Sequence, residues 1–275
     1  MKKYILFLFG LLLVFTGCRE EELDMTLTQK TLFENAVFDA FELKNAWNVT
    51  IIQDDQISGL ELEYSSYLEE YLDVTLDGST LKIGLNKQFH IPYNTVMNAV
   101  VHVKDLRELN AKSATEVTLD GAFTGTHLKL DLNGASVFRN GSFTGNADIT
   151  LDGASQIADF VVNSGLCELE FDGASSFKGD LNADSLIVVM DGASRMVTYG
   201  GQVQQAWFDL ESASIVNMTF TPIDKAFVEL EGAAEAYLHV NVLLSGTLRA
   251  ASTLGYEGNP TVDLDSDVSS SFGPL

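Results

Sequence analysis

From about residue 31 onward, hydrophobic and polar residues alternate in short runs. The clearest are residues 60–64 (Leu-Glu-Leu-Glu-Tyr) and 80–85 (Thr-Leu-Lys-Ile-Gly-Leu), and the second run follows an Asp-Gly turn. A period of two puts the apolar side chains on one side of a β-strand. Residues 65–71 are the one segment whose pattern favours a helical turn. The pattern therefore predicts a domain built almost entirely of strands.

A five-residue motif recurs through the second half of the chain. It has an apolar residue, then Asp, Asn or Glu, and ends in Gly-Ala-Ser or a close variant. Its clear copies begin at Leu132, Leu151, Phe171 and Met190, with weaker copies at Leu210, Leu230 and Leu248. The third residues of successive copies are 19, 20, 19, 20, 20 and 18 positions apart. Such uniform spacing predicts one structural unit repeated along the chain.

A repeat of about twenty residues with no helical segment predicts one circuit of a parallel β-solenoid. A unit this short cannot bury its own apolar side. Stacking coils about 4.8 Å apart lets equivalent side chains such as Leu151, Phe171 and Met190 form continuous interior columns. Gly-Ala-Ser suits a tight corner, where larger side chains of adjacent coils would collide. The rival fold, an antiparallel sandwich, does not predict such regular spacing of one motif.

The residue before each motif glycine is acidic in most copies. Stacked coils would place these carboxylates about 5 Å apart, so the column must face solvent, splay apart or hold cations such as Ca²⁺. The nonapeptide calcium repeat is absent, and a solvated acidic edge is the favoured interpretation. The alternative is a column that binds cations weakly or faces a partner. The column follows Asn133 and comprises Asp152, Asp172, Asp191, Glu211 and Glu231.

Charge narrows the classes of partner. The chain has 39 acidic and 16 basic residues, for a formal net charge of -23. A surface this acidic repels phosphate backbones, which excludes nucleic-acid binding through a basic footprint.

The N-terminus has the pattern of an export signal. Lys2 and Lys3 precede an apolar run over residues 4–15, which is too short to span a bilayer, and Phe-Thr-Gly-Cys follows. This Phe-Thr-Gly-Cys sequence, residues 15–18, resembles a bacterial lipobox, which implies lipidation of Cys18. The glutamates at 20–22 resemble the surface-export signal of Bacteroidetes lipoproteins. We therefore predict a signal peptide over residues 1–17 and a tether over 18–30.

Nothing in the sequence predicts a catalytic centre. Cys167 lies in an alternating stretch with no His nearby and is expected to be a buried, inert thiol. No nucleophile elbow or His-Glu-x-x-His motif occurs, and the even repeat spacing leaves no room for loops that would wall a cleft. Single aromatic side chains are expected to pack in the core or at coil edges rather than stack on sugars. They are Trp47, Tyr64, Tyr67, Tyr71, Tyr199 and Trp207.

Two passages before the repeats carry a family resemblance. Residues 68–83, with Leu-Glu-Glu-Tyr followed by Asp-Gly-Ser-Thr-Leu-Lys-Ile, and residues 101–109 resemble the first half of the GIN domain. The Gly-Ala-Ser coils resemble the serial small-residue motifs of that family, which is the head domain of proposed auto-transporter adhesins. The resemblance covers about residues 30–265. It implies a right-handed parallel β-helix in the envelope of a Gram-negative bacterium, with no catalytic residues to carry over.

The sequence thus predicts one solenoid domain over residues 31–275. It should have irregular N-terminal coils over 31–110, repeat coils over 111–255 and a C-terminal cap over 256–275. The expected function is that of a non-catalytic outer-membrane lipoprotein, an adhesin or interaction module without cofactor or metal. Its expected partners are the membrane, through the lipid, and a glycan or envelope protein. A carbohydrate-active enzyme of the lyase or hydrolase type and a purely structural envelope component remain alternatives.

Overall fold

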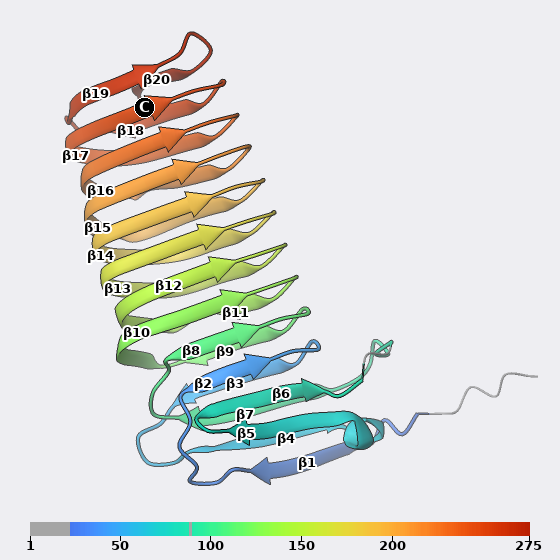
Figure 1. Cartoon of the computed structure of the whole chain (residues 1–275). Coiled ribbons are helices and arrows are strands. Elements are labelled where there is room, and N and C mark those ends of the chain that lie inside the picture. The colour runs from blue at the N-terminus through green and yellow to red at the C-terminus, as the bar shows by residue number, and fades with distance from the viewer. Residues whose placement is uncertain (1–22, 88–89) are drawn as a thin grey trace, which may run out of the picture.

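The protein is a stack of β-coils. The computed structural model describes residues 23–87 and 90–275, and Figure 1 shows the coils rising from N-terminal strands at one end to the C-terminus at the other. Cys18 and the predicted signal peptide lie outside the described residues. Within those residues, no helix is long and apolar enough to cross a membrane.

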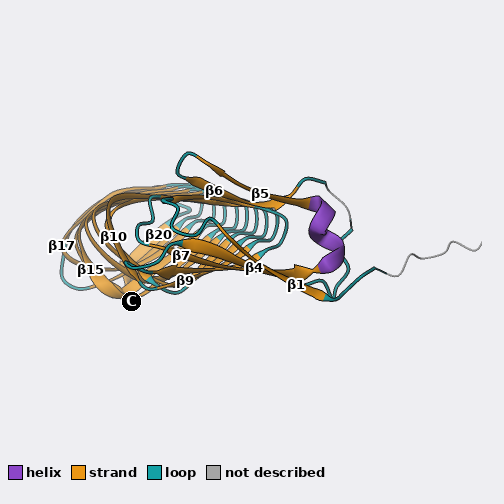
Figure 2. Cartoon of the chain, turned by 90° about the horizontal axis from the view of Figure 1, so that it is seen from below, coloured by secondary structure: helices purple, strands orange, loops and turns teal. Residues whose placement is uncertain are grey.

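Two layers of strands enclose a continuous apolar core (Figure 2). The first layer, in spatial order, contains β1 (Leu27–Leu32), β4 (Gly59–Ser65), β7 (Met97–Val103), β3 (Asn48–Gln53), β9 (Glu116–Asp120) and β11 (Val137–Arg139). The second contains β5 (Leu72–Asp77), β6 (Thr80–Leu85), β2 (Ala40–Leu43), β8 (Glu108–Ala111), and the later parts of β10 (Ala122–Leu132) and β12 (Ser142–Leu151).

Above these strands the coils become regular. Five long strands each run through both layers and bend at the edge between them. They are β13 (Gln156–Phe171), β14 (Ser176–Met190), β15 (Arg195–Leu210), β16 (Ile215–Leu230) and β17 (Glu235–Leu248). All pair in parallel with their neighbours, and the register aligns Leu151 with Phe171 and Phe171 with Met190. The predicted parallel solenoid and its interior columns are confirmed.

The Gly-Ala-Ser motif forms the corner opposite this bend. Gly173 has φ +74°, and a Cβ at this residue would lie 2.5 Å from the carbonyl oxygen of Gly153 in the coil below. Ser175 points inward and is buried, and its hydroxyl donates a hydrogen bond of 2.7 Å to the carbonyl of Asp172. The serine therefore ties the corner together from inside, because it satisfies a carbonyl that the turn would leave without a partner.

The ends of the stack differ from the prediction. Residues 27–30, expected in the tether, belong to β1, which pairs antiparallel with β4. The helical turn expected over residues 65–71 is confirmed as a 3₁₀ helix, η1 (Ser66–Tyr71), and it buries Leu68. At the other end, the segment expected as a cap continues the coils. It contains β18 (Thr253–Glu257), β19 (Thr261–Ser266) and β20 (Ser271–Pro274), all parallel to the strands below.

Candidate functional site

The predicted acidic column lies on the exposed corners. Asp152, Asp172, Asp191, Glu211 and Glu231 are all exposed, one per coil. Asp191 accepts a hydrogen bond of 2.6 Å from the Ser212 hydroxyl of the next coil, and this bond, with one from the Gly192 amide, lowers the pKa of the Asp191 carboxyl. Among the described residues, no group of three His, Cys, Asp or Glu side chains is arranged to hold a metal ion. A role of this edge in binding a partner remains a prediction.

Cys167 is fully buried in the core, and burial raises the pKa of its thiol to about 12. At neutral pH the nucleophilic thiolate is therefore almost absent. The four histidines do not converge. His102 and His239 are half-buried, and their Nδ1 atoms lie 3.4 Å from Asp54 Oδ2 and 4.0 Å from Glu257 Oε2.

We predict that Cys167 resists alkylation by iodoacetamide at pH 8 in the folded chain and reacts fully after denaturation in urea, because only unfolding exposes and ionises the thiol. Mass spectrometry of peptides from the two samples measures this. The Cys167→Ser variant assigns the additional label to this residue. Rapid labelling of the native chain at Cys167 would contradict the expectation.

The aromatic residues divide into two groups. Trp47 and Tyr64 are fully buried, as expected. Tyr199 and Trp207, in contrast, are 55% and 39% exposed and lie outside the core. Tyr199 is at a β-bulge between coils, where no residue of β14 pairs with it. Trp207 occupies an outward position in the second layer, where the alternation of β15 places it.

Trp207 belongs to an exposed apolar patch, which we call the aromatic patch. Its ring stacks on that of Phe227 one coil above, with centroids 5.4 Å apart and planes inclined by 14°. Ile187 lies one coil below in the same outward column, and Val189 is beside Ile187. These four residues line a shallow hollow of about 450 Å³. The column has a sequence signal, since Ile187, Trp207 and Phe227 recur every twenty residues at polar-side positions.

A larger groove lies on the first layer at the N-terminal coils. Its volume is about 510 Å³, and it crosses four neighbouring strands, β1, β4, β7 and β3. The register sets Gln29 opposite Glu63, Glu63 opposite Asn98, and Asn98 opposite Asn48. These four residues form the first row of the groove. A second row beside it consists of Thr31, Glu61, Val100 and Thr50, and we call the two rows together the polar groove.

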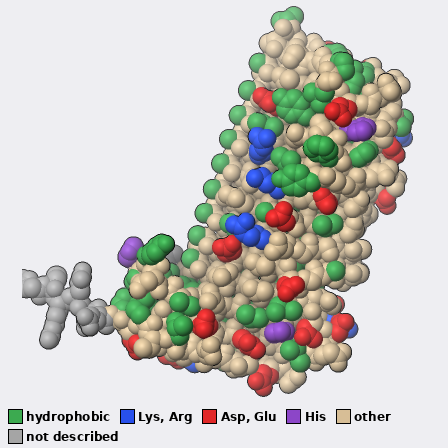
Figure 3. Space-filling view, turned by 180° about the vertical axis from the view of Figure 1, so that it is seen from behind, with side chains coloured by type: hydrophobic (Ala, Val, Ile, Leu, Met, Phe, Trp, Pro, Cys, Tyr) green, Lys and Arg blue, Asp and Glu red, His purple; other side chains and the backbone are tan. Residues whose placement is uncertain are grey.

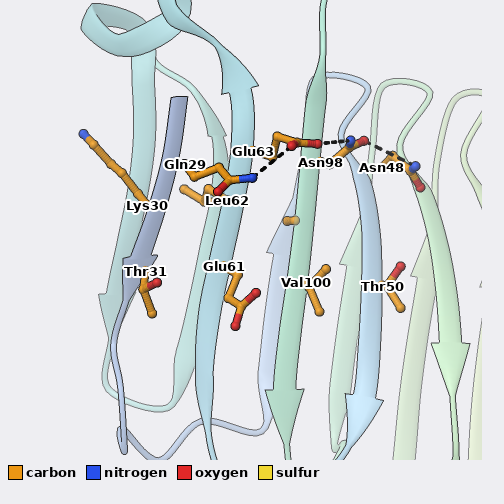
Figure 4. Close-up of a pocket in the computed structure, with 11 residues that line it drawn as sticks. Gln29, Lys30, Thr31, Asn48, Thr50, Glu61, Leu62, Glu63, Asn98 and Val100 are labelled. Atoms are coloured by element: carbon orange, nitrogen blue, oxygen red, sulfur yellow. Dashed lines mark hydrogen bonds between the residues drawn. The ribbon is translucent and has the colours of Figure 1, made fainter. Parts of the chain in front are cut away.

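Hydrogen bonds hold the first row in a fixed arrangement (Figure 4). The amides of Gln29 and Asn98 donate to the two carboxylate oxygens of Glu63, at 3.1 and 3.2 Å, and Asn48 donates to Asn98 at 3.5 Å. Lys30 points away from the row and contacts Glu69 through its ammonium group. The row therefore contains ordered amides and a carboxylate that forms no ion pair with any of the described residues.

The second row of the groove retains its full hydrogen-bonding capacity. Within the described part of the chain, no side-chain hydrogen bond or ion pair involves Thr31, Thr50 or Glu61. Each Asn and Gln in the first row also keeps donors or acceptors that the row does not use. The polar groove thus presents both hydrogen-bond donors and acceptors across four neighbouring strands. Such a surface suits a ligand rich in hydroxyl groups.

Other surfaces carry weaker signals. On the face drawn in Figure 3, acidic, basic and hydrophobic side chains are interspersed, with a short row of Lys and Arg along one side. Arg139 contributes to the basic side chains of the first layer, but its Nε lies 2.9 Å from Glu116 Oε1, so part of this charge is neutralised internally.

The fold and its surfaces define a class of protein, a β-solenoid that offers long, open faces. The family model of the "putative auto-transporter adhesin, head GIN domain" matches residues 37–165 and 142–260. The chain belongs to this family, as its sequence predicted.

Solved structures show the same fold. A putative adhesin from Parabacteroides distasonis is 15% identical, with a TM-score of 0.69 over 92% of this chain and 98% of that one. A putative lipid binding protein from the same species, also 15% identical, has a TM-score of 0.63 over the same shares of both chains. A putative adhesin from Parabacteroides merdae is 15% identical, with a TM-score of 0.66 over 90% and 96%. Comparison with curated proteins finds no match.

Proposed function

We propose that this chain is a non-catalytic, lipid-anchored adhesin of the bacterial cell envelope that binds a carbohydrate in the polar groove. The observation that carries the proposal is the hydrogen-bonded row from Gln29 to Asn48, which presents amide and carboxylate groups held in a fixed arrangement. Sugar hydroxyls both donate and accept hydrogen bonds, so they match a surface of this composition. The family supports the adhesin part of the proposal, as do the putative adhesins among the solved structures that share this fold.

Preorganisation is the physical reason to favour this surface. Each side chain of the row is held by its neighbours, so a ligand would not have to pay the full rotamer entropy of ordering them. The strands beneath are buried on their inner side, with Leu62 and Ala99 in the core. The row therefore stands on a rigid support, as an accurate hydrogen-bonding site requires.

We expect the full-length chain to bind a subset of glycans on an array, and Asn98→Ala to weaken that binding about tenfold. Asn98 links Glu63 to Asn48, so its loss removes direct contacts and frees both neighbours, at about 0.5–1.5 kcal/mol for each hydrogen bond. Biolayer interferometry with the best array ligand measures the dissociation constant.

Asn182→Ala is the matched control. Asn182 also donates to an asparagine of the neighbouring coil, Asn163, at 2.9 Å, but it lies outside the polar groove. It should bind like the parent chain. Equal loss in both variants, or no glycan bound at all, would refute the proposed site. Release of reducing ends from a polysaccharide panel would instead support the enzyme alternative.

A further inference from the structure

We infer that the aromatic patch is the contact between two copies of this chain that stand side by side with their solenoid axes parallel. The patch lies on the second layer, away from the polar groove on the first. Trp207 and Val189 are 39% and 42% exposed, a costly arrangement for large apolar side chains at the centre of a regular sheet.

The charges beside the patch are arranged asymmetrically. Along β16, Lys225, Phe227 and Glu229 occupy successive outward positions, so Phe227 has a cation on one side and a carboxylate on the other. One coil below, Trp207 lies between the neutral Gln205 and the acidic Asp209, so the carboxylate side recurs but the cation does not. In the described residues Lys225 has no ion pair.

This order makes the face self-complementary for one rotation. Consider a two-fold axis that runs between two copies, along the column of Trp207 and Phe227. Rotation by 180° exchanges the two flanks, so Lys225 of one copy faces Glu229 of the partner subunit and Gln205 faces Asp209 of the partner subunit, while the aromatic side chains meet at the centre. A two-fold axis that runs across the coils, parallel to the strands, would instead place Lys225 on the same flank as Lys225 of the partner subunit. Charge complementarity thus selects the parallel pair.

The surrounding charges limit the contact to four coils, β14 to β17. Glu168 lies below Ile187, and Asp263 lies above Ser245, in the outward column of Trp207 and Phe227. In the pair each of these carboxylates would face the same carboxylate of the partner subunit. Both lie two coils, about 10 Å, from the aromatic pair at 4.8 Å per coil, so they bound the contact at its two ends. The contact is therefore small, and a contact below the usual interface size gives only a weak association that requires a high local concentration.

Two chains anchored in one membrane would satisfy that requirement. The parallel arrangement keeps both N-termini at the same end, and it leaves the polar grooves on the outer sides of the pair. The inference does not depend on what the groove binds.

Disulfide trapping of the full-length chain in the bacterial envelope tests the pair. Ser245 lies directly above Phe227 in the central column, so Ser245→Cys should give a dimer of twice the chain mass after mild oxidation. Ser176→Cys, at an outward position of the first layer, is the matched control and should stay monomeric. The parent chain sets the background, because Cys167 is buried.

Charge reversal in the Ser245→Cys chain provides the sharper test. Lys225→Glu and Glu229→Lys should each reduce the trapped dimer about fivefold, because each turns two attractive pairs into repulsive ones. The double variant should restore the dimer. General repulsion between acidic chains predicts instead that Glu229→Lys increases trapping. That result, equal trapping at Ser176→Cys, failure of the double variant to recover, or a disulfide to a different protein would overturn the inference.

Discussion

Replacing Phe160 by alanine is expected to lower the free energy of unfolding by about 3–5 kcal/mol, as is usual for a fully buried phenylalanine. Its ring packs edge-on against Phe138, with centroids 5.1 Å apart and planes at 82°. The residue paired with Phe160 in the next coil is Gly179, which has no side chain that could move into the space. The cavity would therefore stay open. Urea denaturation followed by circular dichroism measures the change.

Phe220→Ala is the control for this substitution. Phe220 is 70% exposed, so its loss should change the free energy of unfolding by no more than about 0.5 kcal/mol. A small effect at Phe160, similar to that at Phe220, would show that the coil interior is not packed as described.

Gly173→Ala is expected to destabilise the fold by about 2–4 kcal/mol. The left-handed backbone of Gly173 costs a residue with a Cβ about 1–2 kcal/mol. The new Cβ would also lie 2.5 Å from the Gly153 carbonyl oxygen, which accepts a hydrogen bond of 2.7 Å from the amide of Ala174. Relief of this contact requires two stacked corners to move apart and adds a further cost, as overpacking usually does. The midpoint of urea denaturation should fall accordingly.

Gly78→Ala separates the two contributions. Gly78 has φ +60°, close to that of Gly173, but a Cβ there would meet nothing within 4 Å. This variant should show the backbone cost alone. If both variants lose the same stability, close stacking of the corners contributes nothing and the physical account of the motif is wrong.

The repeat coils could be predicted because one local pattern determines both the strand and the corner. Leu151, Phe171 and Met190 align as their spacing indicates. The antiparallel pairing at the N-terminal end was not predictable in this way. The sequence of β1, Leu-Thr-Gln-Lys-Thr-Leu, is mostly polar because β1 lies at the edge of the sheet, so it resembles a tether. Its partner β4 begins 27 residues after the end of β1, and nothing local indicates the pairing.

The candidate sites show the same contrast. The aromatic patch repeats with the coil period, and attention to the outward positions of each repeat would have found it. The polar groove has no such signal, because Gln29 and Asn98 are brought to opposite sides of Glu63 only by pairing between strands distant in sequence. Single polar residues of strands alternate with apolar ones everywhere in this chain, so those of the groove do not stand out before folding.

The corner also determines how the height of the molecule can change. Each corner joins its neighbours mainly through stacked backbone, as in the bonds from Ala174 to Gly153 and from Ala193 to Gly173. If one whole repeat were lost or duplicated, the coils on either side would still stack through equivalent backbone hydrogen bonds, and the other coils would not change. Gene-level expansion and contraction can therefore adjust the reach of such a protein in increments of about 4.8 Å, while single extra residues are absorbed by β-bulges such as the one at Tyr199.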